Sequence, residues 1–145
     1  MSLQSWKTFG WLTTHEPTKR EIADLLAVVE RDLKSSEAAG LDADWAMSIA
    51  YNAALQAGTA ALAAAGYRAA RDNHHYRVIQ SLAETLKTDA ATIGRLDSFR
   101  KKRHLSGYER PGQASDADAK AMRDLATSLR EQLVSWLGKN HPELI

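Results

Sequence analysis

The stretch ADWAMSIAYNAALQAGTAALAAAG, residues 43–66, decides the fold class of this 145-residue chain. One side of it carries larger apolar residues at helical spacing, and the other side is mostly alanine, which lets a second helix approach closely. It ends at Gly66, a residue type that commonly terminates helices. The stretch therefore predicts the central helix of the fold, capped by Asp42 or Asp44. The larger residues are Trp45, Met47, Tyr51, Leu55 and Leu62.

Four further helices are predicted around this stretch from apolar residues spaced three and four apart. The first begins after Pro17 with the capping-box pattern of Thr18 and Glu21. Two more begin near residues 73–74 and near 89, and the last follows the loop of residues 108–115 and is capped by Ser115 and Asp118. Their inward positions are Ile22, Leu25, Leu26, Val29 and Leu33, then His75, Val78, Ile79, Leu82 and Leu86, then Ile93, Leu96 and Phe99, and finally Met122, Leu125, Ala126, Leu129, Leu133, Trp136 and Leu137.

The predicted architecture is all-α, an antiparallel bundle of four to five helices. Strand patterns are nearly absent, because β-branched residues never alternate with polar ones for more than a few positions. Residues 16–145 are expected to form one helical-bundle domain, preceded by a weakly structured arm, residues 1–15. Three aromatic residues of the arm, Trp6, Phe9 and Trp11, are too many for a free tail, so the arm should pack on the bundle or on a partner subunit.

Composition excludes several function classes. The chain has no cysteine, which rules out disulfides, thiol nucleophiles and cysteine-based zinc sites. A formal charge of +1 is unlike that of a dedicated nucleic-acid binder, although a local basic patch is compatible with it. Residues 1–11 lack the pattern of a signal peptide, and polar residues interrupt the apolar stretch at 43–66. We therefore expect a cytoplasmic protein that does not enter a membrane.

The densest polar cluster is DSFRKKRH, residues 97–104, followed by GYER, residues 107–110. Arg103 follows Leu96 by seven residues and Phe99 by four, so its side chain emerges on the face that packs on the core. Two interpretations remain open for it: a half-buried salt bridge, to Asp97 or to another helix, and a phosphate-binding site.

The cations before Arg103 have two interpretations as well. Arg100, Lys101 and Lys102 are candidate phosphate-binding residues, yet cations near the C-terminus of a helix are also favoured when they simply face solvent. Arg100 and His104 are four residues apart and share one face, and Tyr108 lies four residues further along.

No metal or cofactor is expected. His74 and His75 are adjacent, so on a helix they point about 100° apart and do not easily hold one ion. His74 is assigned to the helix start and His75 to a position against the bundle. No serine-protease spacing, phosphate-binding glycine loop or zinc-protease motif is present. The polar residues Asn52, Gln56 and Thr59 of the central helix are predicted to form an interhelical hydrogen-bond network.

Three pieces of the chain, at residues 44–67, 73–86 and 95–109, contain the motifs AAGYR (64–68), HHYRVI (74–79) and RHLSGYE (103–109). In this order they resemble the HEPN superfamily of helical-bundle domains. The resemblance covers about half to two-thirds of the chain. It implies a homodimer of four-to-five-helix bundles from a toxin-antitoxin, CRISPR or phage-defence system. Many members of the superfamily are metal-independent ribonucleases.

The resemblance also assigns candidate catalytic residues. Arg103 and His104 match the arginine and the polar residue of the family motif, and Tyr108 stands where the motif has histidine. The family mechanism needs an arginine to hold the scissile phosphate and an imidazole to transfer a proton. Tyr108 would donate a hydrogen bond to the phosphate, while His104, alone or with Arg100, would transfer the proton.

Two functional hypotheses follow. The first is a HEPN-like dimer that binds RNA or a nucleotide in a basic groove between protomers, with weak or lost ribonuclease activity. The second is a noncatalytic interaction module whose partner is a nucleotidyltransferase or an antitoxin protein.

Overall fold

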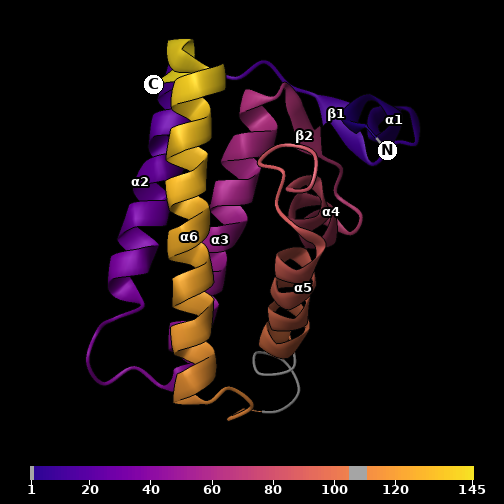
Figure 1. Ribbon diagram of the computed structural model, residues 1–145. Coiled ribbons are helices and arrows are strands. Elements are labelled where there is room, and N and C mark those ends of the chain that lie inside the picture. Colours follow the sequence, from indigo (N-terminus) through magenta and orange to yellow (C-terminus); the bar gives the residue numbers. More distant parts are fainter. Residues whose placement is uncertain (1, 105–110) are drawn as a thin grey trace.

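The computed structural model describes residues 2–104 and 111–145, and this part of the chain is mainly helical (Figure 1). Its elements are α1 (Leu3–Thr8), β1 (Leu12–Thr14), α2 (Lys19–Ser35), α3 (Ala43–Ala64), β2 (Tyr67–Ala69), α4 (His74–Ser81), α5 (Ala90–His104), α6 (Asp116–Asn140) and the short 3-10 helix η2 (Pro142–Leu144). The all-α class is therefore confirmed, with the addition of a small sheet formed by β1 and β2. Within the described residues, no helix has both the length and the apolar composition that a membrane span requires.

Helix α3 is the centre of the fold, as residues 43–66 predict. It contacts α2 and α6 on one side and α4 and α5 on the other (Figure 1). From Ala46 to Ala64 every alanine of α3 is buried, because small side chains let the neighbouring helices pack closely. Trp45, which shares the apolar pattern in sequence, is instead 64% exposed at the start of the helix.

The polar residues of α3 form the predicted interhelical network in part. The amide of Asn52 donates to Oδ2 of Asp32 on α2 over 2.6 Å, and Gln56 donates to the amide oxygen of Asn52 over 3.3 Å. Thr59 does not join them, since its hydroxyl donates to the backbone carbonyl of Leu55 in its own helix. The network gives the buried Asp32 carboxylate a partner inside the protein.

The starts of α2 and α6 follow the capping patterns of the sequence, whereas Asp42 stands at the N-cap of α3 without a side-chain hydrogen bond and Asp44 lies within the helix. Thr18 accepts a hydrogen bond from the backbone N–H of Glu21, while the Glu21 carboxylate binds Nε2 of His15 over 2.7 Å. At the start of α6, Ser115 and Asp118 form a complete capping box. Helix α4 begins at His74, after Asn73 in the left-handed conformation, and ends at Ser81. It is thus shorter than its apolar pattern, although Leu82 is buried and Leu86 packs against the core.

The N-terminal arm is ordered, which corrects the expectation of a weakly structured segment at residues 1–15. It forms α1 and then β1, which pairs with β2 in an antiparallel register that places Leu12 opposite Ala69. Trp6 and Leu12 are 8% and 2% exposed, so the arm packs against its own chain. Burial of its aromatic residues and hydrogen bonds to a distant strand supply the stability that this short segment lacks in isolation.

Candidate functional site: a cationic cleft between α4 and α5

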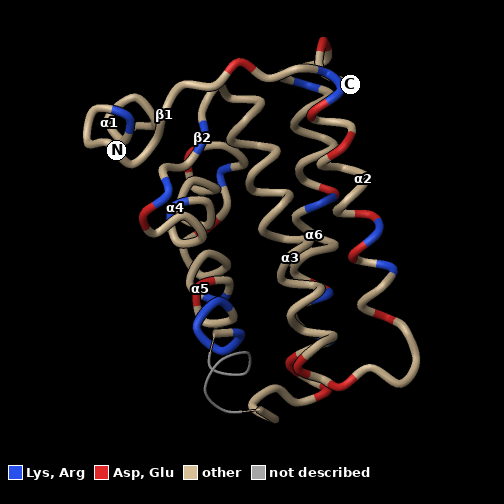
Figure 2. The backbone as a smooth tube through the Cα atoms, turned by 180° about the vertical axis from the view of Figure 1, so that it is seen from behind, with Lys and Arg blue, Asp and Glu red and all other residues tan. Residues whose placement is uncertain are grey.

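A cleft of about 320 Å³ lies where the start of α4 meets the end of α5, and we call it the α4–α5 cleft. Figure 2 shows lysine and arginine positions gathered at this end of α5. The two helices pack against each other and against α3, which brings the histidines of α4 next to the arginines of α5. The cleft is lined by Asn73, His74, His75, Tyr76, Arg100, Arg103 and His104.

Arg103 is held at the cleft without an acidic partner among the described residues. Its guanidinium carbon lies 5.3 Å above the ring of Tyr51, a cation–π distance. Its Nε atom is buried and makes no hydrogen bond within the described part of the chain. The predicted salt bridge to Asp97 is not formed, because that carboxylate binds Nε of Arg100 over 2.7 Å and Nζ of Lys101 over 3.4 Å.

The three cations that precede Arg103 point in different directions. Arg100 lines the cleft, but Lys101 does not, and Lys102 binds Oδ2 of Asp118 at the start of α6 over 2.9 Å. Partial burial tends to raise the pKa of Asp97, but Arg100 and Lys101 outweigh it and hold that pKa below its ordinary value. Of the predicted phosphate-binding residues, only Arg100 therefore faces the same space as Arg103.

Of the two remaining predicted catalytic residues, the structure describes one. His104 lies at the cleft, where it is exposed at the end of α5. Tyr108 lies outside the described residues.

Sequence reasoning assigned no role at the site to His75 and Tyr51, which lie next to Arg103. The hydroxyl of Tyr51 is 3.3 Å from Nδ1 of His75. Burial raises the pKa of Tyr51 to about 12, against the opposing charges of Arg103 and Arg100, so the phenol keeps its proton at neutral pH. The signal in the sequence was the inward position of both residues, each of which carries a polar tip that needs a partner.

His75 is a neutral imidazole in cationic surroundings. Burial is the largest cause of its lowered pKa, and the charges of Arg103, His74 and Arg100 act in the same direction. A neutral imidazole can accept a proton near pH 7 and return it as the imidazolium, which is what acid–base chemistry at a phosphate needs.

Tyr76 presents an aromatic surface beside the same arginines. Its ring lies at the cleft and is 36% exposed. The guanidinium carbon of Arg100 is 5.6 Å from the ring centroid, and that of Arg77 is 5.5 Å from it. The cleft thus combines donors for anionic oxygens with a flat face on which a base can stack.

The histidines of the cleft are not arranged as a metal site. Among residues 2–104 and 111–145, no group of three or more His, Asp or Glu side chains is placed to hold an ion. The rings of His74 and His75 stand edge to face, with their centroids 6.1 Å apart. The described groups of the cleft can form hydrogen bonds and ion pairs and can transfer protons.

Comparison of the chain with known proteins finds no matching family model, no matching curated protein and no matching solved structure.

Proposed function

We propose that this protein is a HEPN-like domain that binds RNA or a nucleotide and holds a phosphate group in the α4–α5 cleft. The observation that carries the proposal is Arg103, whose buried Nε has no hydrogen-bond partner among the described residues. Leaving a buried donor unpaired costs about 1 to 3 kcal/mol, and more for a charged group. A phosphate oxygen removes this cost and matches the planar fork of donors on a guanidinium.

The charge of the cleft supports an anionic ligand. Its described lining contains two arginines and three histidines, and no Asp or Glu. Asp97 neutralises part of the charge of Arg100, but Arg103 keeps its full charge, since it forms no ion pair in the described part of the chain. The exposed ring of Tyr76 adds a stacking surface, which favours a nucleic acid or nucleotide over a simple inorganic anion.

We further propose weak, metal-independent ribonuclease activity at this cleft. Cleavage next to a 2′-hydroxyl requires a proton acceptor for that hydroxyl and donors for the phosphate oxygens. Arg103 and Arg100 are assigned to the phosphate, and the imidazoles of His104 and His75 to proton transfer. Tyr108 and a second protomer across the groove enter the proposal through the family resemblance.

Binding is tested with a fluorescently labelled oligouridylate at several salt concentrations. Arg103→Ala should weaken binding by at least about tenfold, because it removes a phosphate contact, and the affinity of the unchanged protein should fall steeply as salt rises. Arg95→Ala is the matched control, since Arg95 is exposed on the same helix and does not line the cleft. Equal losses of affinity in the two variants, or an affinity that does not change with salt, would contradict binding at the cleft.

Cleavage is tested on a mixed RNA pool in EDTA with the protein, Arg103→Ala and Tyr108→Phe. Cleavage that is lost in Arg103→Ala supports the nuclease, and the Tyr108→Phe result shows whether the tyrosine hydroxyl contributes. Absence of cleavage in all three preparations leaves RNA or nucleotide binding without catalysis. Sedimentation at micromolar concentration tests the homodimer, and a monomer would contradict a groove between protomers.

A second candidate function is a noncatalytic module that binds a nucleotidyltransferase or an antitoxin protein. It is favoured by Trp45, which is 64% exposed on α3, close in sequence to the 37% exposed Leu41. Co-purification with the product of a neighbouring gene of either class, lost in Trp45→Ala, would support this function. Retention of the partner by Trp45→Ala would contradict the assignment of this surface.

A further inference from the structure

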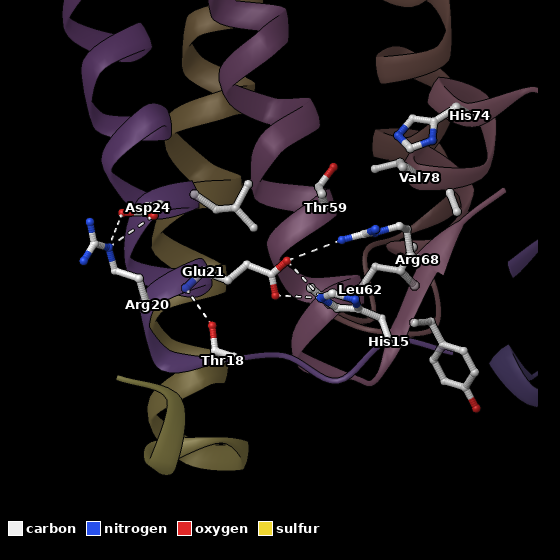
Figure 3. A pocket seen from close by; sticks show the side chains of 14 residues that line it. His15, Thr18, Arg20, Glu21, Asp24, Thr59, Leu62, Arg68, His74 and Val78 are labelled. Carbon is white, nitrogen blue, oxygen red and sulfur yellow. Dashed lines mark hydrogen bonds and ion pairs between the residues drawn. The ribbon is translucent and has the colours of Figure 1, made fainter. Parts of the chain in front are cut away.

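A second cavity, of about 510 Å³, lies beside the α4–α5 cleft, and we call it the α2–α4 cavity. It is bounded by the start of α2, the end of α3, β2 and α4 (Figure 3). Its apolar wall includes Leu25, Leu62 and Val78. The volume falls within the range of about 300 to 1,000 Å³ typical of small-molecule sites.

Polar groups from three elements surround this apolar wall. Arg68 of β2 reaches toward Glu21 of α2, but Nη2 lies 3.8 Å from the carboxylate, which is longer than a hydrogen bond (Figure 3). His15 already occupies both oxygens of Glu21, at 2.7 and 2.9 Å. Arg68 is 61% exposed and its guanidinium forms no hydrogen bond within the described residues, so its donors and its flat face are available to a ligand.

One side chain connects this cavity with the proposed phosphate site. His74 lines the α2–α4 cavity and also lines the α4–α5 cleft, and it is the one residue shared by the two described linings. The His74 side chain therefore belongs to the wall of both spaces, which places the α2–α4 cavity next to the cleft that Arg103 lines.

We propose that the α2–α4 cavity takes the nucleobase of the nucleotide whose phosphate lies in the α4–α5 cleft; this inference rests on the proposed function. A nucleobase has flat apolar faces and a polar edge, so it matches an apolar wall beside a guanidinium plane. Arg68 is placed to stack on the base or to donate to its edge, and the hydroxyl of Thr59 can accept from it. A purely aliphatic ligand would instead bury these polar groups without partners.

The test compares ribose 5-phosphate with uridine and adenosine 5′-monophosphates by titration calorimetry at fixed pH and salt. At least one nucleotide should bind about tenfold or more tightly than ribose 5-phosphate, because only the nucleotide carries a base. Thr59→Phe places a ring in the cavity and should abolish this difference while leaving the affinity for ribose 5-phosphate unchanged. Thr127→Phe, at an exposed position of α6, is the matched control and should retain the difference.

A second variant keeps the test independent of folding changes at Thr59. Arg68→Ala alters an exposed side chain and should lower the affinity for nucleotides several-fold, with that for ribose 5-phosphate unchanged. Equal affinities of the unchanged protein for ribose 5-phosphate and both nucleotides would overturn the base site.

Arg103→Ala separates this inference from the proposed function. It should lower the affinities for both nucleotides and for ribose 5-phosphate by the same factor, because all of them carry the phosphate. That result supports both proposals. If Arg103→Ala changes none of these affinities, the phosphate site is wrong. In that case a nucleotide preference lost in Thr59→Phe still supports base binding in the α2–α4 cavity, and a preference unaffected by Thr59→Phe overturns it.

Discussion

The hydroxyl of Tyr51 on α3 lies 3.3 Å from Nδ1 of His75 on α4, and the same tyrosine ring lies under the guanidinium of Arg103 on α5. One buried side chain of the central helix thus contacts a functional group from each of the two helices that form the cleft. Tyr51 is 1% exposed and its pKa is raised to about 12, so it acts as a neutral, fixed support at physiological pH.

Phosphate binding at the cleft should depend on pH through His75. Burial and the charges of Arg103, His74 and Arg100 lower the His75 pKa, so the imidazole is neutral at pH 7. A bound phosphate opposes those charges and favours the imidazolium, so binding takes up a proton and affinity should rise as the pH falls toward about 5.5. Fluorescence titrations with oligouridylate, whose phosphodiesters and bases do not titrate in this range, measure the effect. His75→Gln should flatten the profile, and an unchanged profile in this variant would contradict the role of His75.

The same lowered pKa predicts acid sensitivity of the unliganded fold. Because the folded state binds a proton at His75 less readily than the unfolded chain does, the contribution of His75 to stability is complete above its unfolded pKa of about 6.5. It is lost as the pH falls below that value. Urea denaturation at pH 7.5 and pH 5.5 should show a smaller pH dependence in His75→Gln than in the unchanged protein. An identical dependence would show that other groups cause it.

Gly58 sets the close approach of α3 and α4. A Cβ atom at Gly58 would lie 2.9 Å from Cγ1 of Val78, a buried β-branched side chain that has few alternative rotamers. Gly58→Ala should therefore lower the free energy of unfolding by about 1 to 3 kcal/mol. Gly94→Ala is the matched control in α5, where a Cβ would have no neighbour within 4 Å. It should instead be stabilising by up to about 1 kcal/mol, and equal effects of the two changes would contradict the close contact.

Asn52 compensates a buried charge. The carboxylate of Asp32 is held by the Asn52 amide at 2.6 Å and by Nε of Arg31 at 3.0 Å. Asn52→Ala removes the shorter of these bonds and should lower the free energy of unfolding by about 1 to 3 kcal/mol in urea denaturation. Gln56→Ala removes only a 3.3 Å bond to the Asn52 oxygen and should cost less. A larger loss of unfolding free energy in Gln56→Ala would show that the hydrogen bond to Asp32 is not the one that stabilises the fold.

Asp44 connects the start of α3 with the segment that leads into α6. Its carboxylate accepts hydrogen bonds from the backbone N–H groups of Gly112, at 2.5 Å, and Ala114, at 2.9 Å. Asp44→Ala should lower the free energy of unfolding by about 1 to 2 kcal/mol, because these donors lose a charged acceptor. Asp42→Ala, at an N-cap position without a side-chain hydrogen bond, should have a smaller effect. Thermal unfolding followed by circular dichroism measures the stability of both variants. Equal losses of stability would contradict the prediction.

Local patterns predicted the helices well because helix formation depends on near neighbours. Thr18 and Ser115 cap the helices that they were expected to cap, and residues 43–64 form a helix that is covered on both sides. The arm was predicted wrongly for the opposite reason. The segment Leu12–Thr14 makes a strand only because Tyr67–Ala69 lies opposite it, and no pattern within residues 1–15 reveals that pairing.

For the candidate site, the sequence by itself determined the residue types and their helix: a run of cations ending at Arg103 and His104 on one amphipathic segment. Only the tertiary structure decided their roles. Lys102 turns to Asp118 of α6, whereas Arg103 meets Tyr51 of α3. Arg100, although it is bound to Asp97, lines the same cleft as His75 of α4. The physical reason is that helical periodicity sets the direction of each side chain, while its partners, burial and pKa depend on which distant helix packs against it.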